Sequence, residues 1–461
     1  MINLFMKLFT HNFGKFEEQE FRKFVRLGFV YFMVVGIYWT IRPLKDSVFM
    51  NLVGGKYIPF AKTVSLFLMI PMVAFYTKLF NIFTKEKIMN IVPTFYGIII
   101  LLFAGLIYMC EDNICTDTTI RNVIAYVWYF LVESWGAIAF ALFWAVSTDV
   151  TTPKSAKQGF SFVYFIGQTA GIIFPLVFVR MPKMLGFTTN LLTLLFASAF
   201  PFIMILLTKY FFDKTPKELL KAFEGEGDKK VAKEKEPKEK TGFTEGLKLL
   251  FTHKYLLCIF LLIFMFEFIA TIFDYNFKLA VDAAFSSSPV DRSSYLGLYA
   301  SCVNFITVVF LLLGASNISR KLGLGISLCC VPLLLGGALF GFLTIDSLNF
   351  LFVLMVSAKA LNYAVSNPSL KQLYIPTTPA VRFKAQAWIE VFGSRLSKES
   401  GSLFNMVLIP LQKVFGAISG KACYLNLAGI VCFPLIVLWF FVAMFLGKTH
   451  KKATTENKPV C

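Results

Sequence analysis

Hydrophobic residues recur along the chain in runs of roughly 20 residues, separated by short polar connections. A helical run of that length crosses a bilayer, because each residue advances the helix by about 1.5 Å and the hydrocarbon core is about 30 Å thick. The pattern predicts about twelve spans, near residues 24–41, 60–83, 88–109, 122–148, 160–180, 187–212, 253–283, 294–315, 322–345, 347–366, 388–412 and 422–446. We therefore expect an all-α membrane protein.

The composition agrees with this pattern. Hydrophobic residues make up 57% of the 461 positions, and 54 of them are Phe, which is more than a soluble core of this size holds. The surplus is expected to face lipid, which leaves no room for a sizeable soluble domain. The first 22 residues lack the apolar core and cleavage site of a signal peptide, so we expect the first span to be retained.

The net charge of +18 raises the question of whether the chain binds nucleic acid. Most basic residues fall instead in short loops, whereas the loop at 110–117 is acidic. Basic loops stay on the cytoplasmic side of a membrane, so the distribution predicts that both termini are cytoplasmic and that nucleic acid is not a partner. The basic residues of the predicted inside loops include Lys85, Lys87, Lys154, Lys157, Arg320, Lys321, Arg382, Lys384, Lys448, Lys451 and Lys452.

A charged, aromatic-poor stretch divides the predicted spans six and six. The triplet Thr-Thr-Pro at 151–153 recurs at 377–379, and the same offset of 226 residues places Glu133 opposite Lys359. A parallel repeat of this kind is typical of transporters with two related halves. We expect an N-terminal six-helix bundle at 1–212, a cytoplasmic linker at 213–252 and a C-terminal six-helix bundle with a basic tail at 253–461.

Ionisable residues inside spans carry most of the functional information, because each costs about 2.5–3.5 kcal/mol near the bilayer centre and normally faces water. Basic residues outnumber acidic ones, which favours a multivalent anion such as a phosphate compound. Pro43 is expected to interrupt the first span beside three of these charges. The candidates are Arg42, Lys45, Asp46, Lys62, Glu133, Glu267, Asp274, Lys278, Lys359, Lys371, Glu390, Arg395, Lys398 and Glu399.

Several of these residues have a second interpretation. Arg42 and Lys62 lie near predicted span ends and could extend to the membrane interface. Lys371, Lys398 and Glu399 could be loop or interface residues. Glu133 and Lys359 lie well inside spans, where either a wet cavity or a structural charge pair would account for them.

No signature of an enzyme or pump is found in the sequence. The three histidines, at 11, 253 and 450, avoid the spans, so a histidine proton relay is not expected. Gly447-Lys448-Thr449 resembles the end of a phosphate-binding loop, but Val442 stands where its first glycine belongs. We expect neither catalysis nor a cofactor or metal; a non-transporting receptor stays open. Cys110 and Cys115 could form an external disulfide or act as small apolar residues.

Several motifs resemble the nonmitochondrial ATP/ADP translocases, the nucleotide transporters of plastids and obligate intracellular bacteria. The first two spans carry the stretches 42–46 (RPLKD) and 58–63 (IPFAKT), and the fourth carries 133–136 (ESWG). The resemblance continues through the second half in the same order. Its further elements are Leu142-Phe143-Trp144, Thr151-Thr152, Tyr374-Ile375-Pro376, Lys384-Ala385 and the stretch from Gly393 to Ser402.

The resemblance implies a twelve-span, major-facilitator-like fold with a nucleotide held between two halves that alternate in access. It implies exchange of external host ATP for internal ADP, with phosphate as a further substrate of some members. Proton-coupled import of nucleotides, or transport of another phosphorylated or organic anion, is the alternative. The expected setting is a monomer in the inner membrane of a bacterium rather than a plastid envelope.

The in-membrane charges and the resemblance together predict the site. Seven basic residues are assigned to the nucleotide phosphates: Arg42, Lys45, Lys62, Lys278, Lys359, Lys371 and Arg395. Asp46, Glu133 and Asp274 are assigned to gating, proton transfer or charge pairing, and Asn362 to a polar substrate contact. Asp274 replaces the family's usual Glu, and Asn362 and Asn367 replace a Lys and an Asp. These departures leave the preferred nucleotide open.

Overall fold

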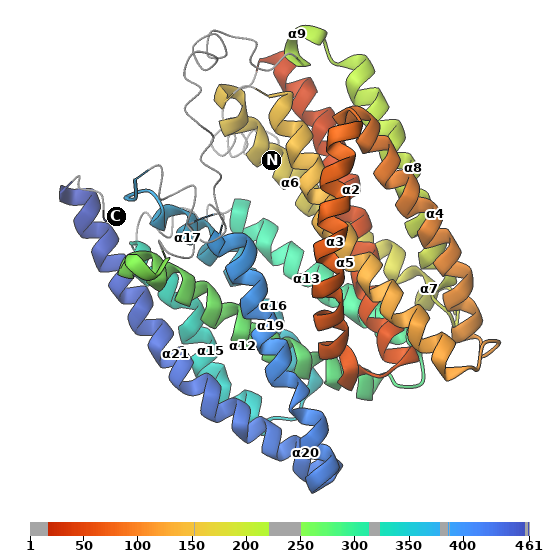
Figure 1. Ribbon diagram of the computed structural model, residues 1–461, viewed down its shortest axis with the longest axis vertical. Coiled ribbons are helices and arrows are strands. Elements are labelled where there is room, and N and C mark those ends of the chain that lie inside the picture. Colours follow the sequence, from red (N-terminus) through yellow and green to blue (C-terminus); the bar gives the residue numbers. More distant parts are fainter. Residues whose placement is uncertain are drawn as a thin grey trace, which may run out of the picture. The chain divides into compact units, whose positions relative to one another are not determined.

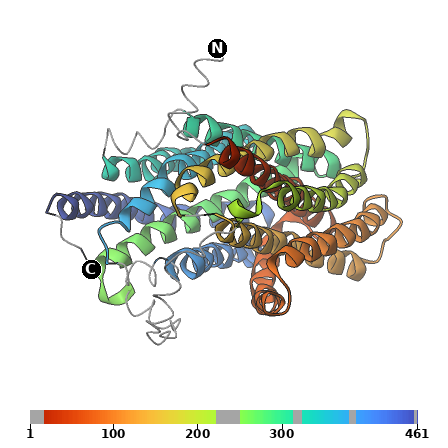
Figure 2. The same ribbon diagram turned by 90° about the horizontal axis from the view of Figure 1, so that it is seen from above.

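The computed structural model describes residues 17–151, 153–220, 250–312, 323–378, 386, 388–456 and 460. These residues form helices joined by short connections, with no strand among them (Figures 1 and 2). The all-α prediction is confirmed. The predicted linker at 213–252 lies largely outside the described residues, as do the loop residues Arg320, Lys321, Arg382 and Lys384.

The helices of the first part of the chain are α2 (Glu18–Leu52), α3 (Ile58–Ile82), α4 (Lys85–Glu111), α5 (Thr118–Asp149), α6 (Pro153–Phe174), α7 (Met181–Met184), α8 (Leu191–Lys214) and α9 (Lys217–Leu220), with the short η1 (Gly55–Tyr57) and η2 (Pro175–Val179). The remainder are α12 (Lys254–Ala284), α13 (Pro289–Leu312), α15 (Leu324–Thr344), α16 (Leu348–Leu361), η3 (Asn362–Ser366), α17 (Asn367–Leu373), η4 (Trp388–Gly393), α19 (Ser394–Met406), α20 (Leu408–Phe415) and α21 (Ala417–Glu456).

Within the described residues, eleven helical segments are long and apolar enough to cross a membrane. The chain is therefore a multi-pass membrane protein. The span predicted at 388–412 does not reach the same apolar level, although it is helical as η4, α19 and α20. Its four charged residues, Glu390, Arg395, Lys398 and Glu399, account for the difference.

The prediction that the first span ends before Pro43 is wrong. Helix α2 continues through Pro43 to Leu52. Proline removes one backbone hydrogen bond, here the bond to the carbonyl of Trp39, but Pro43 is buried and the helix is packed around it. Ile37, Ile41 and Val48 are almost fully buried on the same helix. Tertiary packing thus outweighs the local helix-breaking effect.

Two compact units divide the chain. Unit 1 comprises Met1–Glu234 and Val281–Val308, and unit 2 comprises Lys235–Ala280 and Val309–Cys461. In unit 1, α2 packs against α5, α6 and α8, and α4 packs against α8 (Figure 1). In unit 2, α21 packs against α15 and α20. The division into halves at 1–212 and 253–461 stays a prediction.

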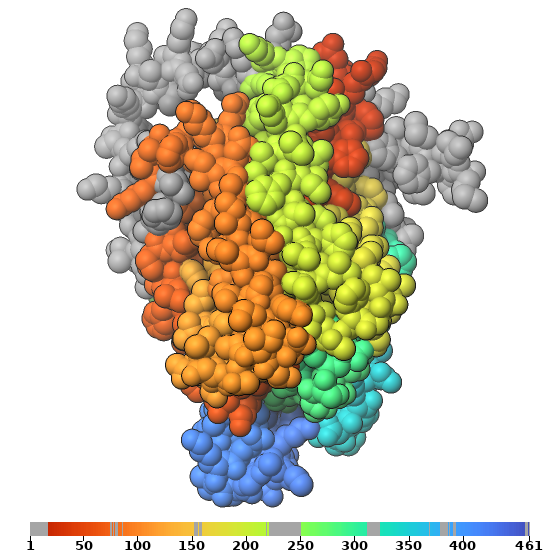
Figure 3. Space-filling model, turned by 90° about the vertical axis from the view of Figure 1, so that its right-hand side faces the viewer, coloured from red at the N-terminus to blue at the C-terminus, as the bar shows by residue number. Residues whose placement is uncertain are grey.

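Helices α4 and α8 present an apolar outer face on unit 1, where they lie side by side in orange and yellow-green (Figure 3). Such a surface would be unfavourable in water, so it marks a face of the unit that contacts lipid. Its exposed side chains are Phe95, Ile98, Leu101, Leu102 and Leu106 on α4, and Leu195, Phe202, Ile203, Leu206 and Tyr210 on α8.

A buried arginine anchors α13 within unit 1. The side chain of Arg292 is only 2% exposed and lies 3.1 Å from the Asp282 carboxylate. Its guanidinium also donates to the backbone carbonyls of Ser47 and Ser286, at 3.4 and 3.3 Å. Asp282 in turn accepts a hydrogen bond from the backbone N–H of Gly55 at 2.8 Å. This ion pair and its hydrogen bonds therefore link α13 to the end of α12 that lies in unit 1, to α2 and to η1.

A second polar network lies between α4, α8 and α13. The Glu111 carboxylate accepts from the backbone N–H of Asn190 at 2.7 Å and from its side-chain amide at 2.8 Å. The Asn190 side-chain oxygen accepts from the Ser293 hydroxyl at 2.6 Å. Because these groups are satisfied by each other, they cross-link three helices without leaving a buried polar group unpaired.

We expect Arg292→Met to destabilise the protein strongly. Removing one partner of a buried ion pair leaves the other partly buried and uncompensated, at a cost of about 3–5 kcal/mol. Lys421→Met is the matched control, because the pair of Lys421 with Asp346 is exposed and worth about 0–1 kcal/mol. Thermal unfolding in detergent measures both effects. Equal, small shifts in melting temperature would contradict the anchoring role of Arg292.

Candidate functional site

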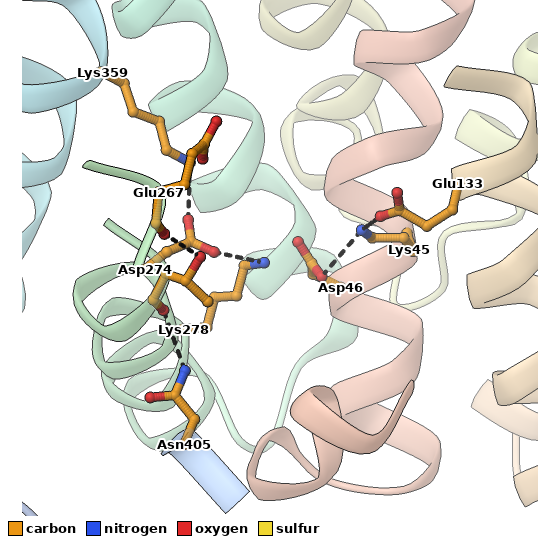
Figure 4. A network of polar contacts seen from close by, with 9 residues as sticks. Lys45, Asp46, Glu133, Glu267, Asp274, Lys278, Lys359 and Asn405 are labelled. Atoms are coloured by element: carbon orange, nitrogen blue, oxygen red, sulfur yellow. Dashed lines mark hydrogen bonds and ion pairs between the residues drawn. The ribbon is translucent and has the colours of Figure 1, made fainter. Parts of the chain in front are cut away.

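A lysine–carboxylate pair connects α2 and α5 in the interior of unit 1. The Lys45 ammonium is buried, donates to the Glu133 carboxylate and lies 3.8 Å from Asp46 Oδ1 (Figure 4). It also lies 4.2 Å from the centre of the Tyr129 ring, a favourable cation–π position. The positive charge of Lys45 is therefore compensated by two acidic groups, and Glu133 takes part in a charge pair.

Arg42 and Lys62 surround this pair. Arg42 lies ten residues before the end of α2, so its predicted position at the end of a span is wrong. Its guanidinium lies 5.0 Å from the Trp39 ring centre and 5.4 Å from that of Tyr38. Lys62 is partly buried on α3, and both cations are close enough to act electrostatically on Glu133. Three basic and two acidic groups thus make up the first cluster.

A corresponding cluster lies in unit 2. Asp274 on α12 accepts from Lys359 on α16 at 2.9 Å and lies 3.0 Å from the Lys278 ammonium (Figure 4). Lys278 follows Asp274 by four residues, which places the two side chains on the same helical face. Both residues are buried. Two lysines therefore share one carboxylate, so this cluster also carries an excess of positive charge.

The two clusters have the same arrangement, but the helices that carry the basic and the acidic residue are exchanged. In unit 1 the basic residue lies on the first span and the acidic residue on the fourth, as Lys45 and Glu133. In unit 2 the acidic residue Asp274 lies on α12, the seventh predicted span, and the basic residue Lys359 lies on α16, the tenth. The sequence repeat that placed Glu133 opposite Lys359 thus relates two residues that each close a charge pair. An excess of positive charge in each cluster suits an anion rich in negative charge.

The remaining predicted residues lie outside these clusters or are uncharged. Asn362 is buried at the start of η3. Lys371 is exposed and pairs with Glu390, which also accepts from Gln386 at 2.9 Å. Arg395 is exposed on α19. The structure therefore brings Lys45, Lys278 and Lys359 into the charge pairs, while Lys371 and Arg395 lie at accessible positions.

Glu267 and Asn405 make further contacts between α12 and α19 in unit 2. Glu267 precedes Asp274 by about two turns of α12. Its carboxylate lies 3.4 Å from Lys398 and accepts from Ser394 at 3.3 Å. Asn405 on α19 donates to the Thr271 carbonyl of α12 at 3.3 Å (Figure 4). These contacts attach α19 to the helix that carries Asp274.

Sequence reasoning missed an uncharged polar chain in unit 2. The Tyr424 hydroxyl donates to Asn405 at 2.6 Å and accepts from Asn276 at 3.3 Å. All three residues are buried, and their hydrogen bonds satisfy one another. The available signal was the presence of asparagines inside apolar spans, where an amide needs a partner as a charge does.

Both clusters contain lysine donors of the kind that bind anions. Lysine donors are held in place by carboxylates, and a phosphate oxygen is a competing acceptor of the same charge-assisted hydrogen bonds. Among the described residues, no group of three or more His, Cys, Asp or Glu side chains could hold a metal ion.

Solved structures of transporters share the fold. The nucleoside transporter NupG matches with a TM-score of 0.58 at 14% identity, over 92% of this chain and 98% of that one. A bacterial homologue of the human lysosomal transporter Spinster matches with a TM-score of 0.55 at 12% identity, over 95% and 99%. The major-facilitator-like fold is therefore confirmed.

Sequence relatives extend over almost the whole chain. ADP,ATP carrier protein 1 of Rickettsia prowazekii (strain Madrid E) is 26% identical over 96% of this chain and 96% of the relative. ADP,ATP carrier protein 2, chloroplastic, of Arabidopsis thaliana is 23% identical over 96% of this chain and 77% of the relative. A model of the TLC ATP/ADP transporter family matches residues 2–126, 118–356 and 347–450. The resemblance first seen in the spans around Lys45 and Glu133 is confirmed, and the chain belongs to the TLC ATP/ADP transporter family.

Proposed function

We propose that this protein exchanges external ATP for internal ADP, with phosphate as a further substrate, across the inner membrane of a bacterium. Both termini are cytoplasmic in this proposal, and the monomer is the transporting unit. The observation that carries it is the pair formed by the buried Lys45 and the partly exposed Glu133, set in a chain of the ATP/ADP transporter family. A buried lysine that is held by a carboxylate can bind a phosphate in its place.

The charge pairs explain how the lysines of an empty binding site keep partners of opposite charge. Without substrate, Glu133 and Asp46 compensate Lys45, and Asp274 compensates Lys359 and Lys278. When a phosphate chain arrives, its oxygens replace the carboxylate as acceptor. Since one charged partner is exchanged for another, the net cost is far smaller than that of stripping a lone charge of its partners.

The other predicted residues take supporting roles in the proposal. Arg42 and Lys62 add positive charge around Glu133, and Lys371 and Arg395 contact phosphates from accessible positions. Asn362 offers an uncharged amide to the substrate. ATP carries more negative charge than ADP, so their exchange moves net charge and proceeds without a co-transported ion.

We expect ADP loaded inside proteoliposomes to accelerate ATP entry strongly. Exchange couples each entry to an exit, so empty vesicles should take up little ATP. Radiolabelled ATP uptake into loaded and empty vesicles makes the comparison. Uptake that ignores internal nucleotide and collapses with an uncoupler would favour proton-coupled import instead. Uptake confined to a different anion would favour the broader alternative of an organic-anion carrier.

We expect Lys45→Ala to weaken ATP binding about 10- to 100-fold. A lost hydrogen bond to a charged group is worth about 1.5–3 kcal/mol, and this range corresponds to that loss in affinity. The loss should be smaller for AMP and absent for adenosine. Lys421→Ala is the control, because Lys421 lies in an exposed pair.

Binding is expressed per folded protein, because a purely structural role of Lys45 would lower the amount of folded protein instead. Normal folding with unaltered ATP affinity would exclude Lys45 from the site.

A further inference from the structure

Helix α2 is buried on every side along its middle except at one place. Every residue from Met33 to Met50 is buried apart from Tyr38, Trp39 and Arg42. Arg42 follows the two aromatic residues by one helical turn, so the three side chains share one face. This accessible patch lies directly before Lys45 on the same helix.

Helix α5 contributes a matching accessible stripe. Glu133, Gly136, Ala137 and Phe140 are partly exposed at helical spacing, whereas residues between them, such as Trp135, are buried. The stripe carries a carboxylate, and the patch on α2 carries a guanidinium. Charged groups inside a membrane protein face water rather than lipid, so we infer that the patch on α2 and the stripe on α5 contact water.

The aromatic rings on this face are fixed by their neighbours. The Tyr38 ring packs edge-on against Phe140 with centroids 5.4 Å apart, and against Trp39 at 5.6 Å. Gly136 allows this approach, because a Cβ atom there would lie 2.8 Å from Tyr38 Cε2. The Arg42 guanidinium lies against both Tyr38 and Trp39. Tyr38 and Trp39 form a rigid aromatic platform.

We propose that the purine base of the transported nucleotide stacks on this aromatic platform. The inference rests on the proposed function and names the part of unit 1 that reads the base. Aromatic side chains bind bases through their π-faces, and arginine adds a further planar contact. Trp39 and Lys45 are six residues apart, or about 9 Å along the helix. That spacing matches the distance from the base of an extended nucleotide to its phosphate chain.

The platform also supplies a recognition element that the lysines lack. Lysine binds a phosphate as a point charge and cannot distinguish a nucleotide from inorganic phosphate chains. A stacking surface one nucleotide's length away adds affinity only for a ligand that carries a base. Trp39 is the principal stacking residue, because Tyr38 is already packed edge-on against Phe140.

Competition binding with the purified full-length protein tests the platform, with ATP and inorganic tripolyphosphate as probes. Trp39→Ala should weaken ATP binding about 5- to 150-fold, which corresponds to about 1–3 kcal/mol of base–aromatic stacking. It should leave tripolyphosphate binding unchanged. Trp39→Phe should restore most of the ATP affinity. Phe29→Ala is the control, because Phe29 is an exposed aromatic residue elsewhere on α2.

The outcomes separate the two proposals. A wild-type protein that binds no nucleotide overturns the proposed function and the platform together. Wild-type ATP binding that Trp39→Ala leaves intact overturns the platform alone. An equal loss of affinity for ATP and for tripolyphosphate also overturns the platform, since Trp39 would then affect the binding of the phosphate chain. If Trp39→Ala does not fold, the wild-type protein decides: ATP should bind more tightly than tripolyphosphate, and equal affinity would contradict base stacking.

Discussion

An ionisable side chain in the interior of a membrane protein must have a partner, because an uncompensated charge there is costly. In this protein that constraint is met by one lysine–carboxylate pair between α2 and α5 in unit 1 and another between α12 and α16 in unit 2. Lys45 meets Glu133, and Asp274 meets Lys359. The pairs fix which faces of α2 and α5, and of α12 and α16, point toward each other. The helices around them are packed by apolar side chains that have no comparable directional requirement.

In the proposed function, the same constraint makes the pairs responsive to substrate. A buried ion pair contributes little net stability compared with well-packed apolar residues, so its retention in a membrane interior calls for a functional account. A phosphate can replace the carboxylate as acceptor without leaving the lysine uncompensated. The ion pair of Arg292 with Asp282 is not expected to respond to substrate. Arg292 is bound by Asp282 and by backbone carbonyls of two segments, so it is held in place rather than available to a ligand.

Much of this arrangement follows from the sequence. Apolar runs predicted the helices. Charges inside them singled out Lys45, Glu133, Asp274 and Lys359, which the structure joins in two charge pairs. The Thr-Thr-Pro repeat related Glu133 to Lys359. The pattern failed at Pro43, where a local rule predicted a helix end that tertiary packing overrides.

Other features depend on helix rotation and distance, which a hydrophobic pattern does not contain. The hydrophobic pattern could not show which lysine pairs with which carboxylate. Arg292 lay at a predicted loop and carried no signal of burial. The platform of Tyr38 and Trp39 was hidden among many aromatic residues, and only its exposure on an otherwise buried stretch of α2 distinguishes it.

In the proposed mechanism, a carboxylate and the substrate phosphate compete for the same lysine. Glu133→Gln tests this most directly, because the amide keeps the shape of the side chain but removes its negative charge. We expect the purified variant to bind ATP at least as tightly as the wild-type protein, while ATP/ADP exchange slows because the side chain at position 133 no longer supplies a carboxylate that pairs with Lys45 on release. A loss of ATP affinity as large as that caused by removing Lys45 itself would contradict the account.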